Sequence, residues 1–379
     1  MNLLIGNWSP EKGRKGLSIY EYNWSNGEIS FIKNIESDVG ISYLVASSSK
    51  EVFYATNETD TVENGIFYNQ ILTFNCNESI SVLNRVSSLG PNPTWICEDD
   101  KGKYILVSHH GGFSHTCTVA KNINGRLEEK LVYDEPHVIL IKLNSDGSCC
   151  EATDAFLPKT NKPNASGLMS RTHSINKAIG KNIFFVCDKG LDAIFSISID
   201  YKNNKIIELD KISVGINESP RYGVVHPDKP IVYVNMEGST NIYALNYDSK
   251  GHMSINQCLD ICSDKNTNIM PSDIIFNNSH DYIYVGLRGI KSIAIIRLDN
   301  AGLMHLVKLV ENPDGNPNQL RFSPDGKYLF VTNIFEGKIT RFTVKDNYDL
   351  VYDGIVAEDN CPASMLFLSL IHISEPTRH

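Results

Sequence analysis

Four side chains could together form a site for acid–base chemistry on an anion: His173, Arg221, Glu237 and Arg288. A histidine with a near-neutral pKa can act as a general base toward water. Arginine binds phosphates and carboxylates through paired hydrogen bonds, and two arginines beside one glutamate leave a surplus of positive charge. We therefore expect these residues to bind an anionic small molecule. The alternative is a purely structural network of ion pairs.

An internal repeat places these residues on equivalent elements. A short apolar run that ends in a small or polar pair recurs seven times, as in FYATN (53–57) and LFVTN (329–333). The third residues of the runs are Ile5, Ala55, Val107, Val186, Val234, Val285 and Val331, spaced by 46 to 52 residues with one interval of 79. Each later run follows an apolar run and a turn such as SPDGK (323–327), and alternating strands come after it. Seven units of four short antiparallel strands predict an all-β fold, the seven-bladed β-propeller.

The two ends of the sequence predict how the ring closes. The chain begins on one of these runs, so its first unit lacks an innermost strand, and CPASMLFLS (361–369) has the pattern of the missing strand. Pairing the C-terminal strand with the N-terminal blade would remove the open sheet edges. We expect residues 1–368 to form a single propeller with an insertion at about 117–165. Residues 369–379 are expected to be a non-native tail.

Strand direction predicts which polar residues share one rim of the ring. The innermost strand of a blade begins beside the end of the second strand, because the two are antiparallel. The resulting rim set is His173, Arg221, Asp273 and Gln319 from innermost strands, and Asn7, Asn57, Glu58, His109, His110, Asp188, Glu237, Arg288 and Asn333 from second strands. Asn and Asp after a strand usually form turns, so we expect a structural role for Asn7, Asn57, Asp188 and Asn333.

Composition and charge exclude several classes of partner. The net charge is −9 and no Lys/Arg cluster occurs, which argues against nucleic acid and against an anionic membrane surface. No apolar run approaches the length of a membrane span, and no signal peptide is recognisable. Nine cysteines without a CxxC pair suggest reduced thiols and a cytoplasmic protein. We expect neither a metal nor a cofactor, and the oligomeric state, monomer or weak dimer, stays open.

The ordered motifs resemble the lactonase family of seven-bladed propellers, typified by a bacterial 6-phosphogluconolactonase and the fungal carboxy-cis,cis-muconate cyclase. The resemblance rests on RTHS (171–174), PRYG (220–223), NMEG (235–238), GLRGIKSIAI (286–295) and NQLRFSPDGKYLFVTN (318–333), and it covers residues 1–368. Carried over motif by motif, it implies catalytic roles for His173, Arg221, Glu237 and Arg288. The expected substrate-binding residues are Arg221, Arg288, Gln319, His109, His110 and Arg171.

This sequence departs from the family pattern at several positions next to the four-residue core. Arg171 replaces the first histidine of the HxHS motif, Tyr222 replaces the histidine of PRH, and Leu287 replaces an asparagine before Arg288. Met236 separates Asn235 from Glu237, where the family has the two adjacent. We expect Met236 to be the first place where substrate preference changes.

The resemblance implies metal-independent hydrolysis of an anionic sugar lactone. In this hypothesis His173, with a pKa near neutrality, is the general base, and the two arginines hold the anion and stabilise the developing oxyanion. Two alternatives stay open: a lyase-type cyclisation of an unsaturated dicarboxylate by the same residues, and a non-catalytic propeller that binds a ligand or a protein. Another class of lactonase propeller binds a divalent metal through Glu, Asn and Asp, and we find no compact set of such residues in the sequence.

Overall fold

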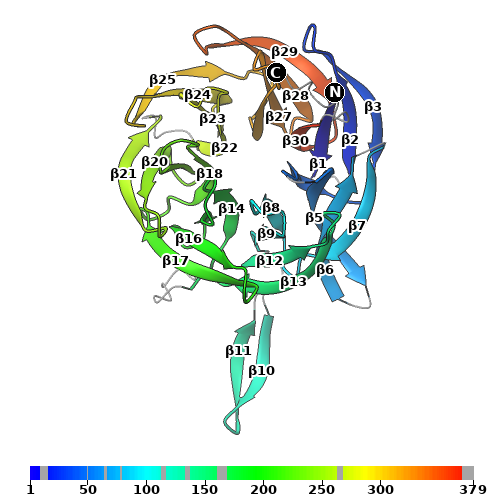
Figure 1. The fold of residues 1–379 in the computed structure, drawn as a ribbon, viewed down its shortest axis with the longest axis vertical. Coiled ribbons are helices and arrows are strands. Elements are labelled where there is room, and N and C mark those ends of the chain that lie inside the picture. The colour runs from blue at the N-terminus through cyan, green and yellow to red at the C-terminus, as the bar shows by residue number, and fades with distance from the viewer. Residues whose placement is uncertain are drawn as a thin grey trace, which may run out of the picture.

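The structure is a computed structural model, which describes residues 1–8, 16–48, 50–63, 66–76, 79–111, 117–132, 137–159, 169–262 and 268–368. The residues expected to form a non-native tail, 369–379, lie outside this part. Within it, seven four-stranded antiparallel sheets and one two-stranded hairpin are present, and the seven sheets are arranged as a ring (Figure 1). The predicted seven-bladed β-propeller is confirmed.

Each blade contributes one strand to each of four concentric layers. The innermost strands are β4 (Ile41–Ala46), β8 (Pro93–Glu98), β14 (Thr172–Lys177), β18 (Pro220–Val225), β22 (Met270–Phe276), β26 (Gln319–Phe322) and β30 (Pro362–Leu368). The second strands are β5 (Val52–Glu63), β9 (Tyr104–His109), β15 (Phe184–Asp188), β19 (Ile231–Met236), β23 (Tyr282–Arg288), β27 (Tyr328–Asn333) and β1 (Asn2–Asn7).

The outer two layers follow in the same order of blades. The third strands are β6 (Ile66–Asn75), β12 (Val138–Leu143), β16 (Ala193–Asp200), β20 (Asn241–Tyr247), β24 (Ser292–Leu298), β28 (Lys338–Val344) and β2 (Leu17–Tyr22). The outermost strands are β7 (Ser81–Ser87), β13 (Cys149–Phe156), β17 (Lys205–Ser213), β21 (Met253–Asp260), β25 (Met304–Glu311), β29 (Leu350–Glu358) and β3 (Ile29–Ile35).

The position of each strand follows from its hydrophobic pattern. Second strands such as β19, IVYVNM, are buried along their whole length, because both faces pack against neighbouring blades. Outermost strands such as β29 alternate between buried or half-buried and exposed residues, because one face meets water. The core therefore lies between blades: one hydrophobic cluster joins Tyr233 of β19 to Val285 of β23. Each blade is rigidly held by the two blades beside it.

The ring closes as the sequence predicted. β30 pairs with β1 in antiparallel register, with Phe367 opposite Leu3 and Met365 opposite Ile5. β30 supplies the innermost strand of the blade that β1, β2 and β3 complete. Both ends of the described chain are thereby fixed in one sheet, and innermost strands contact their neighbours around the whole ring.

The expected insertion at 117–165 is narrower in the structure. Residues 138–143 and 149–156 form β12 and β13, which are the third and fourth strands of a blade. The inserted hairpin consists of β10 (Cys117–Ile123) and β11 (Arg126–Val132) and projects from the ring (Figure 1). The sequence-based boundary was wrong because the strand-like run VILIKL was assigned to the insertion rather than to the blade.

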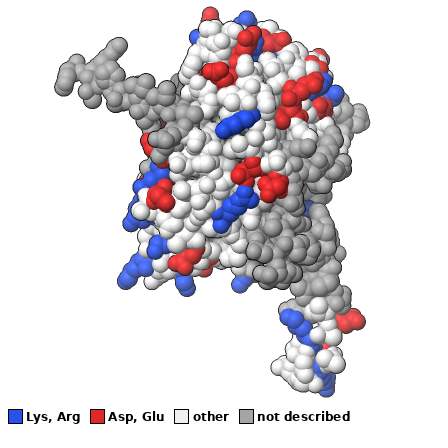
Figure 2. All heavy atoms as spheres, turned by 90° about the vertical axis from the view of Figure 1, so that its right-hand side faces the viewer, with Lys and Arg blue, Asp and Glu red and all other residues white. Residues whose placement is uncertain are grey.

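Positive and negative side chains are interspersed on the face shown in Figure 2, without a large area of one sign. Among the described residues, no helix is both long and apolar enough to cross a bilayer.

Candidate active site

Irregularities in the innermost strands direct side chains into one cavity. The pairing of innermost with second strands shifts register within six blades, next to Ser42, Thr94, His173, Arg221, Ser272 and Ala363. A β-bulge adds one residue to a strand and re-aims side chains, and bulges are common beside active sites. Five of these six residues line the cavity: Ser42, Thr94, His173, Arg221 and Ala363. The bulges thus convert a regular ring of strands into a lined site.

Each blade contributes one residue to the same cavity from its second strand or from the position directly after it. This residue lies three positions after the central residue of each sequence repeat, and it lines the cavity in all seven blades: Trp8, Glu58, His110, Lys189, Glu237, Arg288 and Ile334. The residue before each of these is buried in the protein: Asn7, Asn57, His109, Asp188, Met236, Leu287 and Asn333. Adjacent residues of an extended chain point to opposite sides, which explains the alternation.

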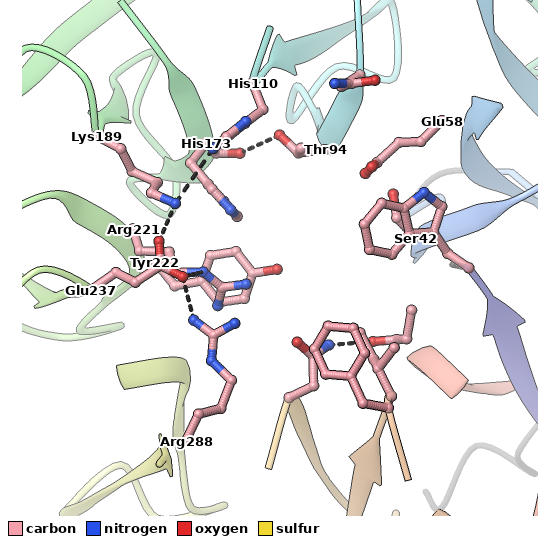
Figure 3. Close-up of a pocket in the computed structure, with 16 residues that line it drawn as sticks. Ser42, Glu58, Thr94, His110, His173, Lys189, Arg221, Tyr222, Glu237 and Arg288 are labelled. Carbon is pink, nitrogen blue, oxygen red and sulfur yellow. Dashed lines mark hydrogen bonds and ion pairs between the residues drawn. The ribbon is translucent and has the colours of Figure 1, made fainter. Parts of the chain in front are cut away.

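The cavity has a volume of about 300 Å³ and two chemically different sides. One side carries the basic residues Lys189, Arg221 and Arg288, together with His110 and His173 (Figure 3). The opposite side carries Glu58 and Ser42 (Figure 3). The apolar lining residues Trp8, Ile334, Phe335 and Ala363 come from the blade adjacent to theirs and from the blade beyond it. A ligand in this cavity would therefore meet cations at one end and a mostly uncharged wall at the other.

Glu237 is the centre of the charged side. Its carboxylate forms ion pairs with Lys189 and Arg288, and Arg221 Nε lies 3.3 Å from its Oε1. Burial alone would raise the pKa of Glu237, but the three cations outweigh burial and hold the pKa well below its ordinary value. Three positive charges therefore face one negative charge, and a local cationic surplus exists in a protein whose net charge is −9.

Arg221 is held in a fixed orientation. Its Nη1 donates a hydrogen bond of 2.6 Å to the carbonyl oxygen of Ser272, and the guanidinium lies 4.3 Å from the centroid of the Tyr222 ring. A stacked, hydrogen-bonded guanidinium loses little freedom when it binds a ligand. Arg221 is thus a preorganised donor on the wall of the cavity.

His173 lies beside these cations and is buried. Its ring packs edge-on against Tyr222, at 5.0 Å between centroids, and against His110 at 5.6 Å. Burial and the charge of Arg221, followed by that of Lys189, lower the pKa of His173 well below its ordinary value of 6.5. Our expectation of a near-neutral pKa was therefore wrong, because the sequence did not show how many cations surround the ring. His173 is a neutral base in this site.

His110 is also neutral. Burial, and then Lys189 and Arg171, lower its pKa to about 3. Its Nε2 lies 3.4 Å from Lys189 Nζ, so an unprotonated His110 can accept a hydrogen bond from the lysine. His110 thereby helps to hold Lys189 against Glu237.

The structure brings together five of the residues expected from the sequence: His173, Arg221, Glu237, Arg288 and His110. It does not place His109, Gln319 or Arg171 in the cavity lining. His109 is fully buried on the other side of its strand, where its ring packs at a tilt against that of His137, with 4.6 Å between the centroids. Gln319 accepts a hydrogen bond from the backbone of Met365 and so joins β26 to β30.

Arg171 and Met236 lie outside the cavity lining. The backbone carbonyl of Arg171 accepts a hydrogen bond of 2.9 Å from the Lys189 N–H, and the charge of Arg171 lowers the pKa of His110. Met236 is fully buried in a core cluster with Val234 and Tyr243. It therefore packs inside the blade, and its expected effect on substrate preference stays a prediction.

The cavity residue Lys189 was missed in the sequence, and Glu58 was expected on this rim but was given no role in the site. A signal for Lys189 was present, since the cavity residue is followed by glycine in four consecutive units: Gly111, Gly190, Gly238 and Gly289. At Gly190 a Cβ atom would lie 1.7 Å from the Met169 carbonyl oxygen, and at Gly238 it would lie 2.0 Å from the Asn217 carbonyl oxygen. Close backbone approach excludes any side chain there. The glycines thus mark the loops that present the charged residues.

The turn-forming role expected for Asp188 is confirmed, whereas Asn57 is structural without forming a turn. Asn57 lies within β5, and its Oδ1 accepts a hydrogen bond of 3.1 Å from the Gly40 N–H in a separate segment. Asp188 accepts hydrogen bonds from the N–H groups of Arg171, Gly190 and Leu191, at 2.8 to 3.0 Å. Asp188 therefore shapes the loop that carries Lys189.

The donor chemistry of the cavity suits an anion better than a cation. Among the described residues, no three His, Cys, Asp or Glu side chains are grouped as metal ligands. The carboxylate of Glu237 is already paired with Lys189 and Arg288. A divalent cation would have to displace these partners.

Replacement of Glu237 by glutamine is expected to lower the free energy of unfolding by about 3–5 kcal/mol at pH 7, because three cations would be left without their buried counter-ion. The folded-state pKa of Glu237 is depressed, so its contribution is present above the ordinary value of 4.5 and lost as the pH falls below it. Urea unfolding at pH 7 and pH 4 should show the difference between wild type and Glu237→Gln shrinking in acid. Glu208→Gln, at an exposed position on β17, is the control. Equal stability at pH 7 would contradict the role of Glu237.

Comparisons with known proteins agree with this architecture. The family model described as "Lactonase, 7-bladed beta-propeller" matches residues 2–351. A 6-phosphogluconolactonase of Formosa agariphila is 22% identical over 353 residues, covering 90% of this chain and 91% of that protein. A 6-phosphogluconolactonase of Bacillus subtilis is 22% identical over 334 residues, covering 87% of each. The structure of a periplasmic gluconolactonase of Pseudomonas aeruginosa superposes with a TM-score of 0.82 at 15% identity, over 98% of this chain and 99% of that one.

Proposed function

This chain belongs to the lactonase family of seven-bladed β-propellers, and from that premise we propose that it hydrolyses an anionic sugar lactone without a metal ion. The substrate class is that of 6-phosphogluconolactone, as named for the two curated relatives. The observation that carries the proposal is the cavity in which Lys189, Arg221 and Arg288 face the single carboxylate of Glu237. A buried excess of cations is costly unless an anion compensates it.

A phosphate group supplies the negative charge and the hydrogen-bond acceptors that this side of the cavity lacks. It carries up to two negative charges and several acceptor oxygens, which match the unused donors of two arginines and a lysine. With the phosphate bound to the cations, the lactone ring would extend toward Glu58 and the apolar wall. The carbonyl carbon would then lie within the cavity, where bulk water has little access.

Hydrolysis in this site needs a base, an attacking water and a stabilised oxyanion. His173 is neutral and can accept a proton from the water as its oxygen bonds to the carbonyl carbon. The carbonyl oxygen becomes negative in this step, and an arginine N–H on the cavity wall can donate a hydrogen bond to it. Glu237 orients the arginines through its ion pairs.

Binding of the substrate would change the pKa of the base, His173. Arg221, Lys189 and Arg288 all lower the pKa of His173. An anion that pairs with them reduces their effect on the imidazole, so the pKa of His173 rises toward its ordinary value when substrate binds. A stronger base is then formed only when the substrate is in place.

The proposal is tested by turnover of 6-phosphoglucono-δ-lactone, glucono-δ-lactone and a muconolactone, with spontaneous hydrolysis subtracted and with EDTA present or absent. We expect the phosphorylated lactone to be the best substrate and EDTA to leave its rate unchanged, because no step uses a metal. Loss of activity in EDTA that returns with added divalent cation would contradict the metal-independent mechanism. Preference for the muconolactone would favour the cyclase alternative, and no turnover of any lactone would favour a binding module.

A further inference from the structure

Glu58 is the acidic residue on the side of the cavity opposite the cations. It lies on β5, and its carboxyl group points into the cavity across from Arg221 and His173 (Figure 3). Among the described residues, no lysine or arginine lies within ion-pair distance of this carboxyl, in contrast to Glu237, which is held by cations. Its hydrogen-bonding neighbour is the hydroxyl of Ser42 on β4. A carboxyl group placed this way is free to exchange a proton with a ligand.

The surroundings make Glu58 a weak acid. Burial raises its pKa to about 7, and the Ser42 hydroxyl and Arg221 only partly oppose the rise. The other titratable and charged groups that line the cavity with it are His110, His173, Lys189, Tyr222, Glu237 and Arg288. Burial therefore raises the pKa of Glu58 and lowers the pKa of His173. It favours the protonated carboxyl group and the unprotonated imidazole.

Two groups with separated pKa values are the usual basis of an acid–base pair. Below about pH 7 the carboxyl of Glu58 holds its proton and can donate it, while neutral His173 can accept one. The chemistry of lactone hydrolysis needs both functions, because the departing ring oxygen is an alkoxide unless it is protonated. The two groups face the cavity from different blades, so a bound lactone can lie between them.

We propose that Glu58 is the catalytic general acid, which protonates the ring oxygen of the lactone as its bond to the acyl carbon breaks. This inference rests on the proposed function, since it assigns a step of the same reaction. It also gives a reason for the polarity of the cavity: the anionic group is bound at the cationic side, and the leaving oxygen is directed to the side of Glu58.

The proposed step balances in atoms and charge. The water oxygen bonds to the carbonyl carbon and gives one proton to His173, while the carbonyl electron pair moves onto oxygen. When this pair returns, the bond from carbon to the ring oxygen breaks, and the ring oxygen takes the proton of Glu58 to become a hydroxyl. His173 then loses a proton and Glu58 regains one from solvent, and the acid product ionises. The net reaction is lactone plus water to hydroxy-carboxylate plus a proton.

The acid role predicts the pH dependence of the rate. In wild type, kcat/KM for 6-phosphoglucono-δ-lactone should fall as the pH rises through about 7, because Glu58 loses the proton that it must donate. In Glu58→Gln the plateau should be about 100-fold lower, and the fall near pH 7 should be absent. Glu151→Gln, at an exposed position on β13, should keep the wild-type profile. Thermal unfolding of each variant shows whether the fold is retained.

A second substrate separates an acid from a residue that only shapes the cavity. A carboxylated dihydrocoumarin has a phenolic ring oxygen, which can leave as a phenolate without a proton. Glu58→Gln should lose much less activity on this lactone than on the sugar lactone, whereas a distorted cavity would impair both equally. Equal losses on both lactones, an unchanged rate in Glu58→Gln, or a wild-type rate that rises through pH 7 would each overturn the assignment. If wild type hydrolyses no lactone, the proposed function fails, and with it the assignment of Glu58.

Discussion

His173→Gln is expected to hydrolyse 6-phosphoglucono-δ-lactone about 10²–10⁴ times more slowly than wild type at saturating substrate, the range typical for loss of a general base. That loss corresponds to about 3–5 kcal/mol in the activation barrier. Glutamine has a similar size and can still accept a hydrogen bond from water, but it cannot take the proton. Binding should change little, because the anion is held by Lys189 and the arginines rather than by the imidazole.

The pH profile gives an independent measure of the same role. The pKa of His173 in the free enzyme is held well below 6.5, so wild-type kcat/KM, which reports the free enzyme, should not decline as the pH falls through 6.5 and should decline only in stronger acid. The decline should be missing in His173→Gln. His252→Gln changes an exposed histidine that pairs with Asp248, and it should leave both rate and profile unchanged. If His173→Gln is as active as wild type, His173 is excluded as the base, and Glu58 is then to be considered in that role.

The fold could be predicted from the sequence because each blade repeats the same local pattern. The apolar runs around Val107, Val234 and Val331 are buried on both faces, so their composition differs clearly from that of the outer strands. The count of seven runs and the lone C-terminal strand then determined the number of blades and the closure. The insertion was harder to delimit, because β12 follows the hairpin β10–β11 with no difference in composition that separates blade from insertion.

The site could be predicted only in part, because a shift of one residue reverses which side of a strand a side chain faces. The sequence drew attention to Asp188, yet the cavity is lined by the following residue, Lys189. It also drew attention to both His109 and His110, of which only His110 lines the cavity. Bulges in the innermost strands and glycine-containing loops determine this register. Comparing all seven repeats at one position would have added Lys189 to Glu58, which the predicted rim already contained.

The pKa values could not be predicted from the sequence at all. His173 has no charged neighbour closer in sequence than Arg171, but in the structure it is surrounded by cations from three other segments. Glu58 and Glu237 occupy equivalent positions in their repeats, and their pKa values are shifted in opposite directions. The difference arises from the neighbouring blades: cations surround Glu237, whereas Glu58 is buried with Ser42 as its hydrogen-bonding neighbour. One structural position thus yields a proton donor in one blade and a permanent anion in another.

Arg221→Lys is expected to lower kcat/KM for the phosphorylated lactone by about 10²–10³-fold, although the positive charge is retained. The guanidinium is fixed by the Ser272 carbonyl and the Tyr222 ring, with its Nε beside Glu237. The other N–H groups of this rigid, planar guanidinium are available to the ligand. A lysine ammonium cannot make the stacked contact or bind two oxygens in one plane. Arg297→Lys, on the exposed side of β24, is the matched control and should behave as wild type.

The ratio of activities on phosphorylated and unphosphorylated lactone decides what Arg221 recognises. If Arg221 binds the phosphate, the substitution should reduce kcat/KM for 6-phosphoglucono-δ-lactone and leave the much lower value for glucono-δ-lactone nearly unchanged. If Arg221 instead stabilises the oxyanion, both substrates should lose activity by the same factor, mainly in kcat. Unchanged activity on both would contradict a role for Arg221 in the reaction and would favour a structural ion-pair network around Glu237. The geometry favours the phosphate, because Arg221 shares Glu237 with Lys189 and Arg288, and the three cations converge on one region of the cavity wall.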